Sequence, residues 1–145
     1  MKSYEKFKAG GRMNLLMSIK PEFVDKILAH EKLYEFRKSI FKQDVEKIFI
    51  YSTYPVKKIV GYFEVSEIIS ESPRKLWDSL SEVSGISEKD FFRYFDGSKT
   101  GFAIKIDNLK IFDEFINMDS YDDFKAPQSF CYVENYDILR ELLLI

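Results

Sequence analysis

Apolar residues recur along the chain with two periods, and they predict short strands alternating with a few helices. The segment "NLLMSI" at 14–19 is a short and nearly continuous apolar run, which is typical of a buried strand. Pro21 then suits the first turn of a helix, where its missing N–H is not needed. The apolar residues of "PEFVDKIL" follow at helical spacing. We therefore expect a strand near 14–19 and a helix over 21–30.

Further strands and helices are predicted along the rest of the chain. The strand segments are rich in Ile, Val, Phe and Tyr, which favour extended structure, and they span 32–38, 47–53, 57–69, 100–106 and 109–116. One helix is expected to begin at Pro73, directly after Ser72. Another begins at Ser87, which has Asp90 three residues later in the manner of a capping box. A helix over 134–145 closes the chain, with its apolar residues on one side.

This order of elements predicts an α+β fold. Strands that return with few helices between them favour a small mixed or antiparallel β-barrel with helices at its ends. The length of 145 residues suits one domain, which we place at 13–145 with the C-terminal helix included, after an N-terminal extension over 1–12. Gly61, in the middle of the longest predicted strand, indicates a bulge or a close approach to the backbone.

Composition and charge narrow the expected partners. The net charge is −2, from 22 Lys and Arg against 24 Asp and Glu, which argues against a protein that coats extended duplex DNA. Aromatic residues reach 17%, so some rings are expected at the surface, where they can stack on a base or a partner. No apolar stretch is long enough for a signal peptide or a membrane span, and we expect a cytoplasmic protein without a membrane partner.

Cysteine and histidine are too scarce for two common kinds of site. Cys131 is the only cysteine, so no internal disulfide can form, and it is expected to behave as a small buried apolar residue. With one cysteine and one histidine, a closed Cys/His zinc site cannot be assembled. We expect no metal and no cofactor.

The segment "HEKLYEFRK" at 30–38 places charges within a predicted strand. Glu35 and Arg37 lie two residues apart and therefore share one face, while Tyr34 and Phe36 share the other. A carboxylate and a guanidinium on one face can pair. Lys32 has the opposite parity and joins them only if the chain bends at the corner that precedes the strand.

Residues 30–37 match the G-x-K-x-x-E-x-R signature of ASCH domains, a branch of the PUA-like barrels, with His30 at the glycine position. Around this motif, "LLMSIKPEFVDKIL" is similar to the strand and helix that lead into it in the family. "VKKIVGYFEV" and "GFAIKI" are similar to later strands, and "KAPQSF" to the closing segment of one subgroup. The resemblance spans 13–133, which is most of the chain.

The resemblance implies a module that binds RNA or a nucleotide-like small molecule in a cleft lined by the signature residues. Lys32 and Arg37 would contact a phosphate or a base edge, and Glu35 would accept a hydrogen bond from a base amino group. The expected ligand-binding residues are Lys32, Glu35, Arg37, Tyr34, Gln128 and Ser129. The base would stack on Tyr34 or Phe36, or on the more distant Tyr54 or Phe130. A regulatory role, for example in transcription, is a further expectation.

Three alternatives stay open at this point. Glu35 and Arg37 can form a purely structural ion pair. Some ASCH proteins are amidohydrolases that act on acetylcytidine, with the motif lysine catalytic and a threonine where this chain has Glu35, and others are ribonucleases. An enzyme of either kind would use Lys32 and Glu35 as catalytic residues, with the lysine pKa lowered by burial and with Glu64 or Glu67 as a further acid. The apolar segment "ILRELLLI" would instead suit a protein-interaction domain, although docking on its own domain is commoner.

Overall fold

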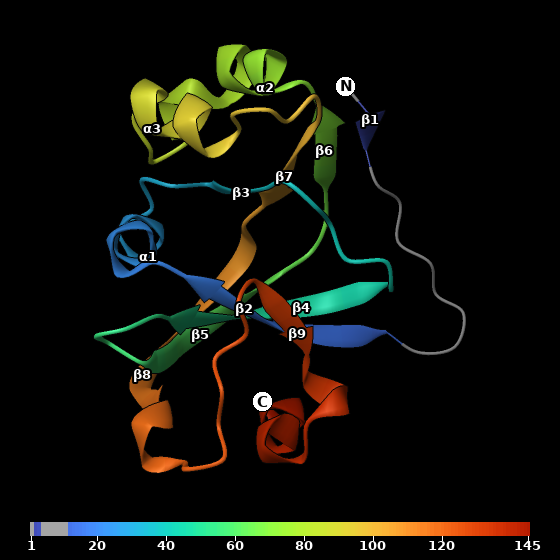
Figure 1. Cartoon of the computed structure of the whole chain (residues 1–145). Helices are drawn as coiled ribbons and strands as arrows, with labels where there is room; N and C mark the ends of the chain where they lie inside the picture. Colours follow the sequence, from blue (N-terminus) through green and yellow to red (C-terminus); the bar gives the residue numbers. More distant parts are fainter. Residues whose placement is uncertain (1, 4–11) are drawn as a thin grey trace.

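Two β-sheets form the framework of the computed structural model, which describes residues 2–3 and 12–145 (Figure 1). The four-stranded sheet has the order β1-β6-β7-β3, with every neighbouring pair antiparallel: Lys2–Ser3 (β1), Ile68–Glu71 (β6), Gly101–Lys105 (β7) and Tyr34–Arg37 (β3). The five-stranded sheet has the order β8-β5-β4-β2-β9: Asp107–Asn117 (β8), Lys58–Glu64 (β5), Val45–Ser52 (β4), Met13–Ile19 (β2) and Phe130–Tyr132 (β9). In this sheet β2 and β4 pair in parallel, and the described pairs β2–β9, β4–β5 and β5–β8 are antiparallel.

The α+β class is therefore confirmed, with mixed strand pairing. The strands divide between two open sheets and do not close into one ring in the part of the chain that the structure describes. Most of the expected extension over 1–12 lies outside the described residues. Within it, β1 pairs with β6, a strand that the sequence pattern did not predict.

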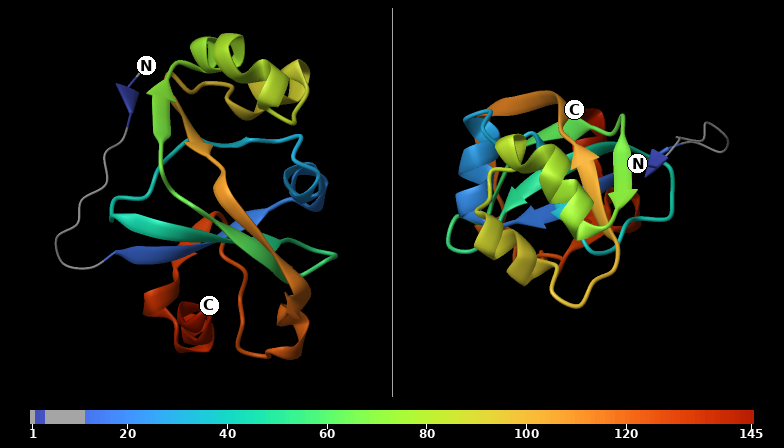
Figure 2. Two further views of the ribbon diagram at one scale, coloured as in Figure 1. Left: turned by 180° about the vertical axis from the view of Figure 1, so that it is seen from behind. Right: turned by 90° about the horizontal axis from the view of Figure 1, so that it is seen from above.

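Helices cover the ends and flanks of the two sheets (Figures 1 and 2). The α-helices are Pro21–Leu28 (α1), Pro73–Leu80 (α2) and Glu88–Tyr94 (α3), and the 3₁₀ helices are Ser81–Val83 (η1), Met118–Ser120 (η2), Val133–Asn135 (η3) and Asp137–Leu144 (η4). The predicted starts of α2 and α3 are confirmed, because the Oγ atoms of Ser72 and Ser87 accept hydrogen bonds from backbone N–H groups in the first turn of each helix.

Three apolar clusters hold these layers together. The first lies between the sheets and includes Met17 of β2, Ile50 of β4 and Ile104 of β7, all buried. The second lies on the outer face of the five-stranded sheet, and the third packs α2 and α3 against the four-stranded sheet. Phe36 belongs to this third cluster, so the opposite face of β3, which carries Glu35 and Arg37, faces away from α2 and toward the other sheet.

The strand predicted over 57–69 is wrong as a single element. It divides into β5 and β6, which belong to different sheets, and the chain crosses between the sheets at 65–67. Both halves are rich in buried apolar residues, and the polar Ser66 and Glu67 between them are too short an interruption to indicate the crossing. The expectation for Gly61 is confirmed: the β5–β8 register shifts beside it, and a Cβ at this residue would collide with the carbonyl oxygen of Lys110.

The C-terminal segment is helical, as predicted, but as the 3₁₀ helices η3 and η4. Leu139 and Leu142 are buried in the second cluster against the outer face of the five-stranded sheet. The segment thus docks on its own chain, which removes the main argument for a dedicated interaction domain. No helix within the described residues combines the length and apolar character needed to cross a bilayer.

Candidate functional site

A tight corner after α1 brings Lys32 to the same side of β3 as Glu35. His30 has a φ of 60°, which is the left-handed region, and it occupies the position where the signature has glycine. The N–H groups of Glu31 and Lys32 both donate to the carbonyl of Lys26, at 2.9 and 3.1 Å, and this closes the corner. The predicted bend is therefore confirmed. It is made by a helix-terminal turn before the strand begins at Tyr34.

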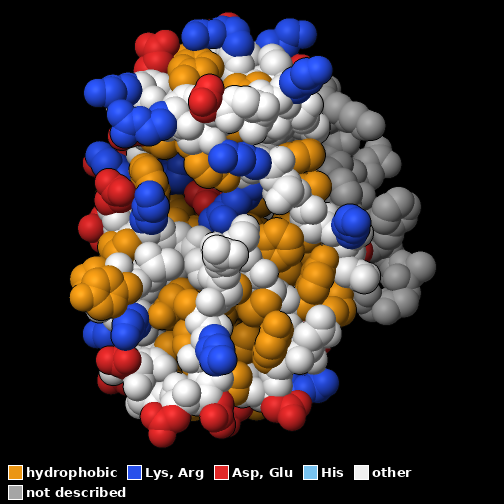
Figure 3. All heavy atoms as spheres, in the orientation of Figure 1, with side chains coloured by type: hydrophobic (Ala, Val, Ile, Leu, Met, Phe, Trp, Pro, Cys, Tyr) orange, Lys and Arg blue, Asp and Glu red, His pale blue; other side chains and the backbone are white. Residues whose placement is uncertain are grey.

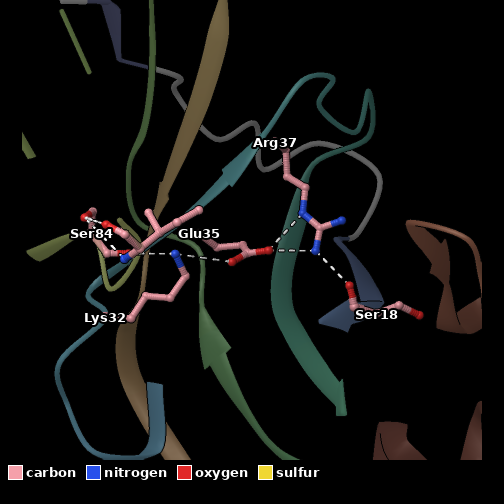
Figure 4. Close-up of polar contacts among 6 residues, drawn as sticks. Ser18, Lys32, Glu35, Arg37 and Ser84 are labelled. Carbon is pink, nitrogen blue, oxygen red and sulfur yellow. Dashed lines mark hydrogen bonds and ion pairs between the residues drawn. The ribbon is translucent and has the colours of Figure 1, made fainter. Parts of the chain in front are cut away.

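Glu35 and Arg37 form a close ion pair across two positions of β3. Nε and Nη2 of Arg37 donate to Oε2 of Glu35 at 3.0 and 2.7 Å (Figure 4). The same guanidinium donates to the backbone carbonyl of Ser18 at 2.8 Å and to Oγ of Ser129 at 3.1 Å. Four of its five N–H groups are thus used. Arg37 links β3 of one sheet to β2 and to the residue before β9 of the other.

Lys32 lies beside this pair with its ammonium group buried. Its side chain is 3% exposed, Nζ lies 3.9 Å from Oε1 of Glu35, and Nζ donates to the carbonyl of Ser84 at 2.8 Å. The ring centroids of Phe36 and Phe23 are 4.8 and 5.4 Å from Nζ. Burial lowers the pKa of Lys32 below its ordinary 10.5, Glu35 opposes this change, and Arg37 adds to it.

These charged groups lie at the inner end of an open cleft of about 710 Å³. The view in Figure 3 shows a hollow on this face, with acidic and basic side chains side by side within it and further basic side chains around its rim. The lining residues come from the end of β2, from α1, β3 and α3, and from the segments that follow β4, precede α3 and precede β9. Ligand pockets in proteins commonly have this size.

The structure brings together most of the residues predicted for the site. Lys32, Glu35, Arg37 and Gln128 line the cleft, and Ser129 contacts Arg37. Tyr34 does not line it, and its side chain packs against the third cluster.

Of the other aromatic and acidic residues predicted near the ligand, one lines the cleft and the rest lie outside it. Phe36 reaches the cleft wall, but Tyr54 is 77% exposed outside the cleft and Phe130 packs against the core between the sheets. Neither Glu64 nor Glu67 lines the cleft, and Glu64 accepts a hydrogen bond from Asn108 at 3.2 Å instead.

Several cleft residues were not predicted. Phe23 comes from α1, and Asp90, Arg93 and Tyr94 come from α3, more than fifty residues after the signature. The pKa of Tyr94 is raised by burial, with opposing influences from Arg37 and Glu35. The aromatic and charged residues along the whole of α3 were the signal in the sequence that could have indicated them. Among the described residues, no cluster of three or more His, Cys, Asp or Glu side chains is arranged to hold a metal ion.

No family model matches the sequence, but similar proteins were found both by sequence and by structure. The chain is 30% identical over 129 residues to a Zymomonas mobilis protein named "ASCH domain-containing ribonuclease", and the match covers 84% of this chain and 85% of that protein. The crystal structure of ASCH from Zymomonas mobilis has a TM-score of 0.79 at 26% identity, covering 90% of this chain and 93% of that one. The N-terminal domain of Staphylothermus marinus McrB has a TM-score of 0.52 at 14% identity, covering 88% and 93% of the two chains, a likeness of fold alone.

Proposed function

This chain belongs to the ASCH domain family, and on that premise we propose that it binds RNA or a nucleotide-like molecule in the cleft between α1, β3 and α3. The name of the Zymomonas mobilis relative supports RNA as the ligand class, because that protein is called a ribonuclease. The residues proposed to contact the ligand or to orient those that do are Lys32, Glu35, Arg37, Gln128 and Ser129.

The observation that carries the proposal is the burial of three ionisable side chains at the inner end of an open cleft. The side chains of Lys32, Glu35 and Arg37 are 3%, 8% and 12% exposed. Burying charged groups is costly, and apolar residues of similar size could often replace a structural ion pair without loss of stability. Buried charges that line an open cleft are better explained by recognition than by packing.

The contacts already made within the cleft suggest how a ligand would be held. Because four of the five N–H groups of Arg37 already donate within the protein, we infer that its main role is to orient Glu35 and Ser129. Oε1 of Glu35 then serves as an acceptor and the ammonium group of Lys32 as a donor, which suits a base edge that carries both kinds of group. A base would stack on Phe23 and Tyr94, which line the cleft, and these are different aromatic residues from those predicted from the sequence.

The depth of Lys32 favours a ligand that can enter the cleft. A paired duplex presents its phosphates on the outside of a wide cylinder, whereas an unpaired nucleotide can turn its base inward. Lys20 and Arg93, which also line the cleft, would face the phosphates of such a strand. The proposal therefore favours single-stranded RNA over duplex RNA.

A titration with labelled single-stranded RNA tests this proposal. Fluorescence anisotropy should show saturable binding by the wild type and at least tenfold weaker binding, a loss of about 1.4 kcal/mol, by Lys32→Met. Lys110→Met is the matched control, because Lys110 is an exposed lysine on β8 that does not line the cleft. Binding by neither the wild type nor the control, across RNAs and nucleosides, would remove the proposal.

RNA cleavage is the second candidate function. It is supported by the relative's name and by the lowered pKa of Lys32, which increases the fraction of neutral amine able to accept a proton. Glu35 opposes that change by favouring the charged form, so binding stands first. Incubation of the same RNAs with the wild type and Lys32→Met, followed by gel analysis, separates the two functions. Deacylation of a modified nucleoside, a regulatory role and a cytoplasmic location stay predictions from the sequence.

A further inference from the structure

The connector between α2 and α3, at 81–86, packs directly on Lys32. The carbonyl of Ser84 accepts the hydrogen bond from Nζ at 2.8 Å, and the carbonyl of Val83 accepts one from the N–H of Leu33 at 2.9 Å. Figure 4 shows Nζ between Ser84 on one side and Glu35 on the other. The connector therefore contacts both the end of the lysine side chain and the backbone that follows it.

The connector is itself held in place. Ser84 is 1% exposed, and its Oγ donates to the carbonyl of Ser81 at 2.7 Å. A buried hydroxyl that bonds within a short loop restricts the conformations open to that loop. The carbonyl that faces Lys32 thus has a fixed position.

Gly85 is needed at this place for two reasons. Its φ of +65° lies in the left-handed region, which residues with a Cβ adopt less readily. In addition, a Cβ at this residue would lie 2.5 Å from Cβ and 2.9 Å from Cγ of Lys32. Real Cβ atoms essentially never come so close, so any larger residue would displace the lysine side chain or the connector.

We propose that the connector 81–86 positions Lys32 in the cleft, with Ser84 holding the ammonium group through its backbone carbonyl and Gly85 permitting the close approach. The same connector leads directly into α3, whose Asp90, Arg93 and Tyr94 line the cleft. It therefore fixes Lys32 relative to the wall that a ligand would contact. Ser84 and Gly85 are positioning residues, and their importance for a ligand rests on the proposed function.

The titration of Lys32 tests this inference without any ligand. The protein is labelled with ¹³C-lysine, and the Cε resonance of Lys32 is followed against pH by NMR in the wild type, Gly85→Ala and Gly97→Ala. Gly97 is the matched control, because its φ is +78° and a Cβ there would meet nothing within 4 Å. Both variants thus carry similar backbone strain, and only one contacts Lys32.

We expect the pKa of Lys32 to rise toward 10.5 in Gly85→Ala and to stay at the wild-type value in Gly97→Ala. The displaced lysine gains contact with water, and burial is the largest cause of its lowered pKa. The charged or titratable groups of the cleft around it are the same in both variants: Lys20, Glu22, Glu35, Arg37, Asp90, Arg93 and Tyr94. Titration curves that coincide in all three proteins would overturn the inference.

A milder variant keeps the test decisive if Gly85→Ala does not fold. Ser84→Ala removes the hydroxyl that restrains the connector and leaves the carbonyl in place. Ser72→Ala is its control, since the hydroxyl of Ser72 caps the first turn of α2, Ser72 does not line the cleft, and its loss also removes a local serine–backbone hydrogen bond. The pKa of Lys32 should rise in Ser84→Ala alone. An equal response of Lys32 in both serine variants would refute a specific role for the connector.

Adding RNA separates this inference from the proposed function. If the connector positions Lys32 and the cleft binds RNA, Gly85→Ala should bind the labelled strand more weakly than Gly97→Ala. If Lys32 responds in the titration but the wild type retains no RNA, the positioning role stands and the RNA proposal fails. If the RNA binds equally to both glycine variants and the lysine titrations coincide, the positioning role fails while the RNA proposal stands.

Discussion

Arg37 holds a single oxygen of Glu35 with two donors, Nε at 3.0 Å and Nη2 at 2.7 Å, and this leaves the other oxygen toward Lys32 at 3.9 Å. The guanidinium also binds the opposite sheet through Ser18 and Ser129. One arginine thereby sets the direction of the carboxylate and joins the two sheets beside the cleft. Arg37 is thus the signature residue that orients the carboxylate, and under the proposed function Lys32 and Glu35 are the two signature residues that contact the ligand.

Replacing Arg37 by lysine should lower the free energy of unfolding. Lysine keeps the charge but cannot make the forked contact with Glu35 while also reaching Ser18, so we expect a loss of about 1.5–3 kcal/mol. Urea denaturation followed by circular dichroism measures this change. Arg74→Lys is the control, because Arg74 pairs with Asp78 at the surface, both more than half exposed, and it should change by less than about 0.5 kcal/mol. Equal losses in the two variants would contradict the bridging role.

The burial of Lys32 predicts a pH dependence of stability with a definite sign. Its pKa is below 10.5 in the folded protein, so between the folded value and 10.5 the unfolded chain binds more protons. The stability of the wild type relative to Lys32→Met should therefore rise as the pH increases through this window, and level off above 10.5. Unfolding at a series of pH values measures the difference. Parallel curves for the wild type and Lys32→Met would show that burial does not lower the pKa of Lys32.

Gly61→Ala should destabilise the five-stranded sheet. The added Cβ meets the carbonyl oxygen of Lys110 on β8, and backbone atoms of a neighbouring strand cannot move aside as a side chain can. We expect a loss of about 2–3 kcal/mol, the upper part of the range for overpacking. The melting temperature by calorimetry checks it, and an unchanged value would mean that β8 can shift away from β5 at little cost.

Cys131 should react slowly with thiol reagents in the folded protein. Burial raises the pKa of its thiol to about 11, so little reactive thiolate is present near neutral pH. We expect the rate of labelling by an aromatic disulfide to be about 100-fold lower in native buffer than in urea, where the thiol regains an ordinary pKa. A native rate close to the rate in urea would show that the thiol is accessible and ionised.

The hydrophobic pattern of the sequence predicted the arrangement of the site residues that lie on the single strand β3. A period of two placed Glu35 and Arg37 on one face and Phe36 on the other, and the structure agrees. The corner that brings in Lys32 was predicted from its parity. What makes the corner is local: the left-handed backbone of His30 and two N–H groups that share the carbonyl of Lys26.

The remainder of the site depends on contacts that leave little trace in the sequence. The partner of Lys32 is a backbone carbonyl at Ser84, which any residue type could supply. Asp90, Arg93 and Tyr94 reach the cleft because α3 packs over the four-stranded sheet, and that placement follows from the division of 57–69 into two strands of different sheets. Since both strands are rich in apolar residues and only Val65, Ser66 and Glu67 separate them, the pattern did not predict their division or the cleft wall that depends on it.

The central claim is that a ligand binds beside the Lys32–Glu35–Arg37 group, and NMR mapping with a short single-stranded RNA tests it most directly. The backbone and side-chain resonances of the ¹⁵N-labelled protein are recorded as the RNA is added. The account predicts that the largest shifts fall on the Nε–H of Arg37 and on α1 and α3 residues of the cleft, and that Lys32→Met needs at least tenfold more RNA to reach the same shifts. Shifts confined to β8 and the C-terminal 3₁₀ helices, or the same cleft shifts at the same RNA concentrations in Lys32→Met, would contradict it.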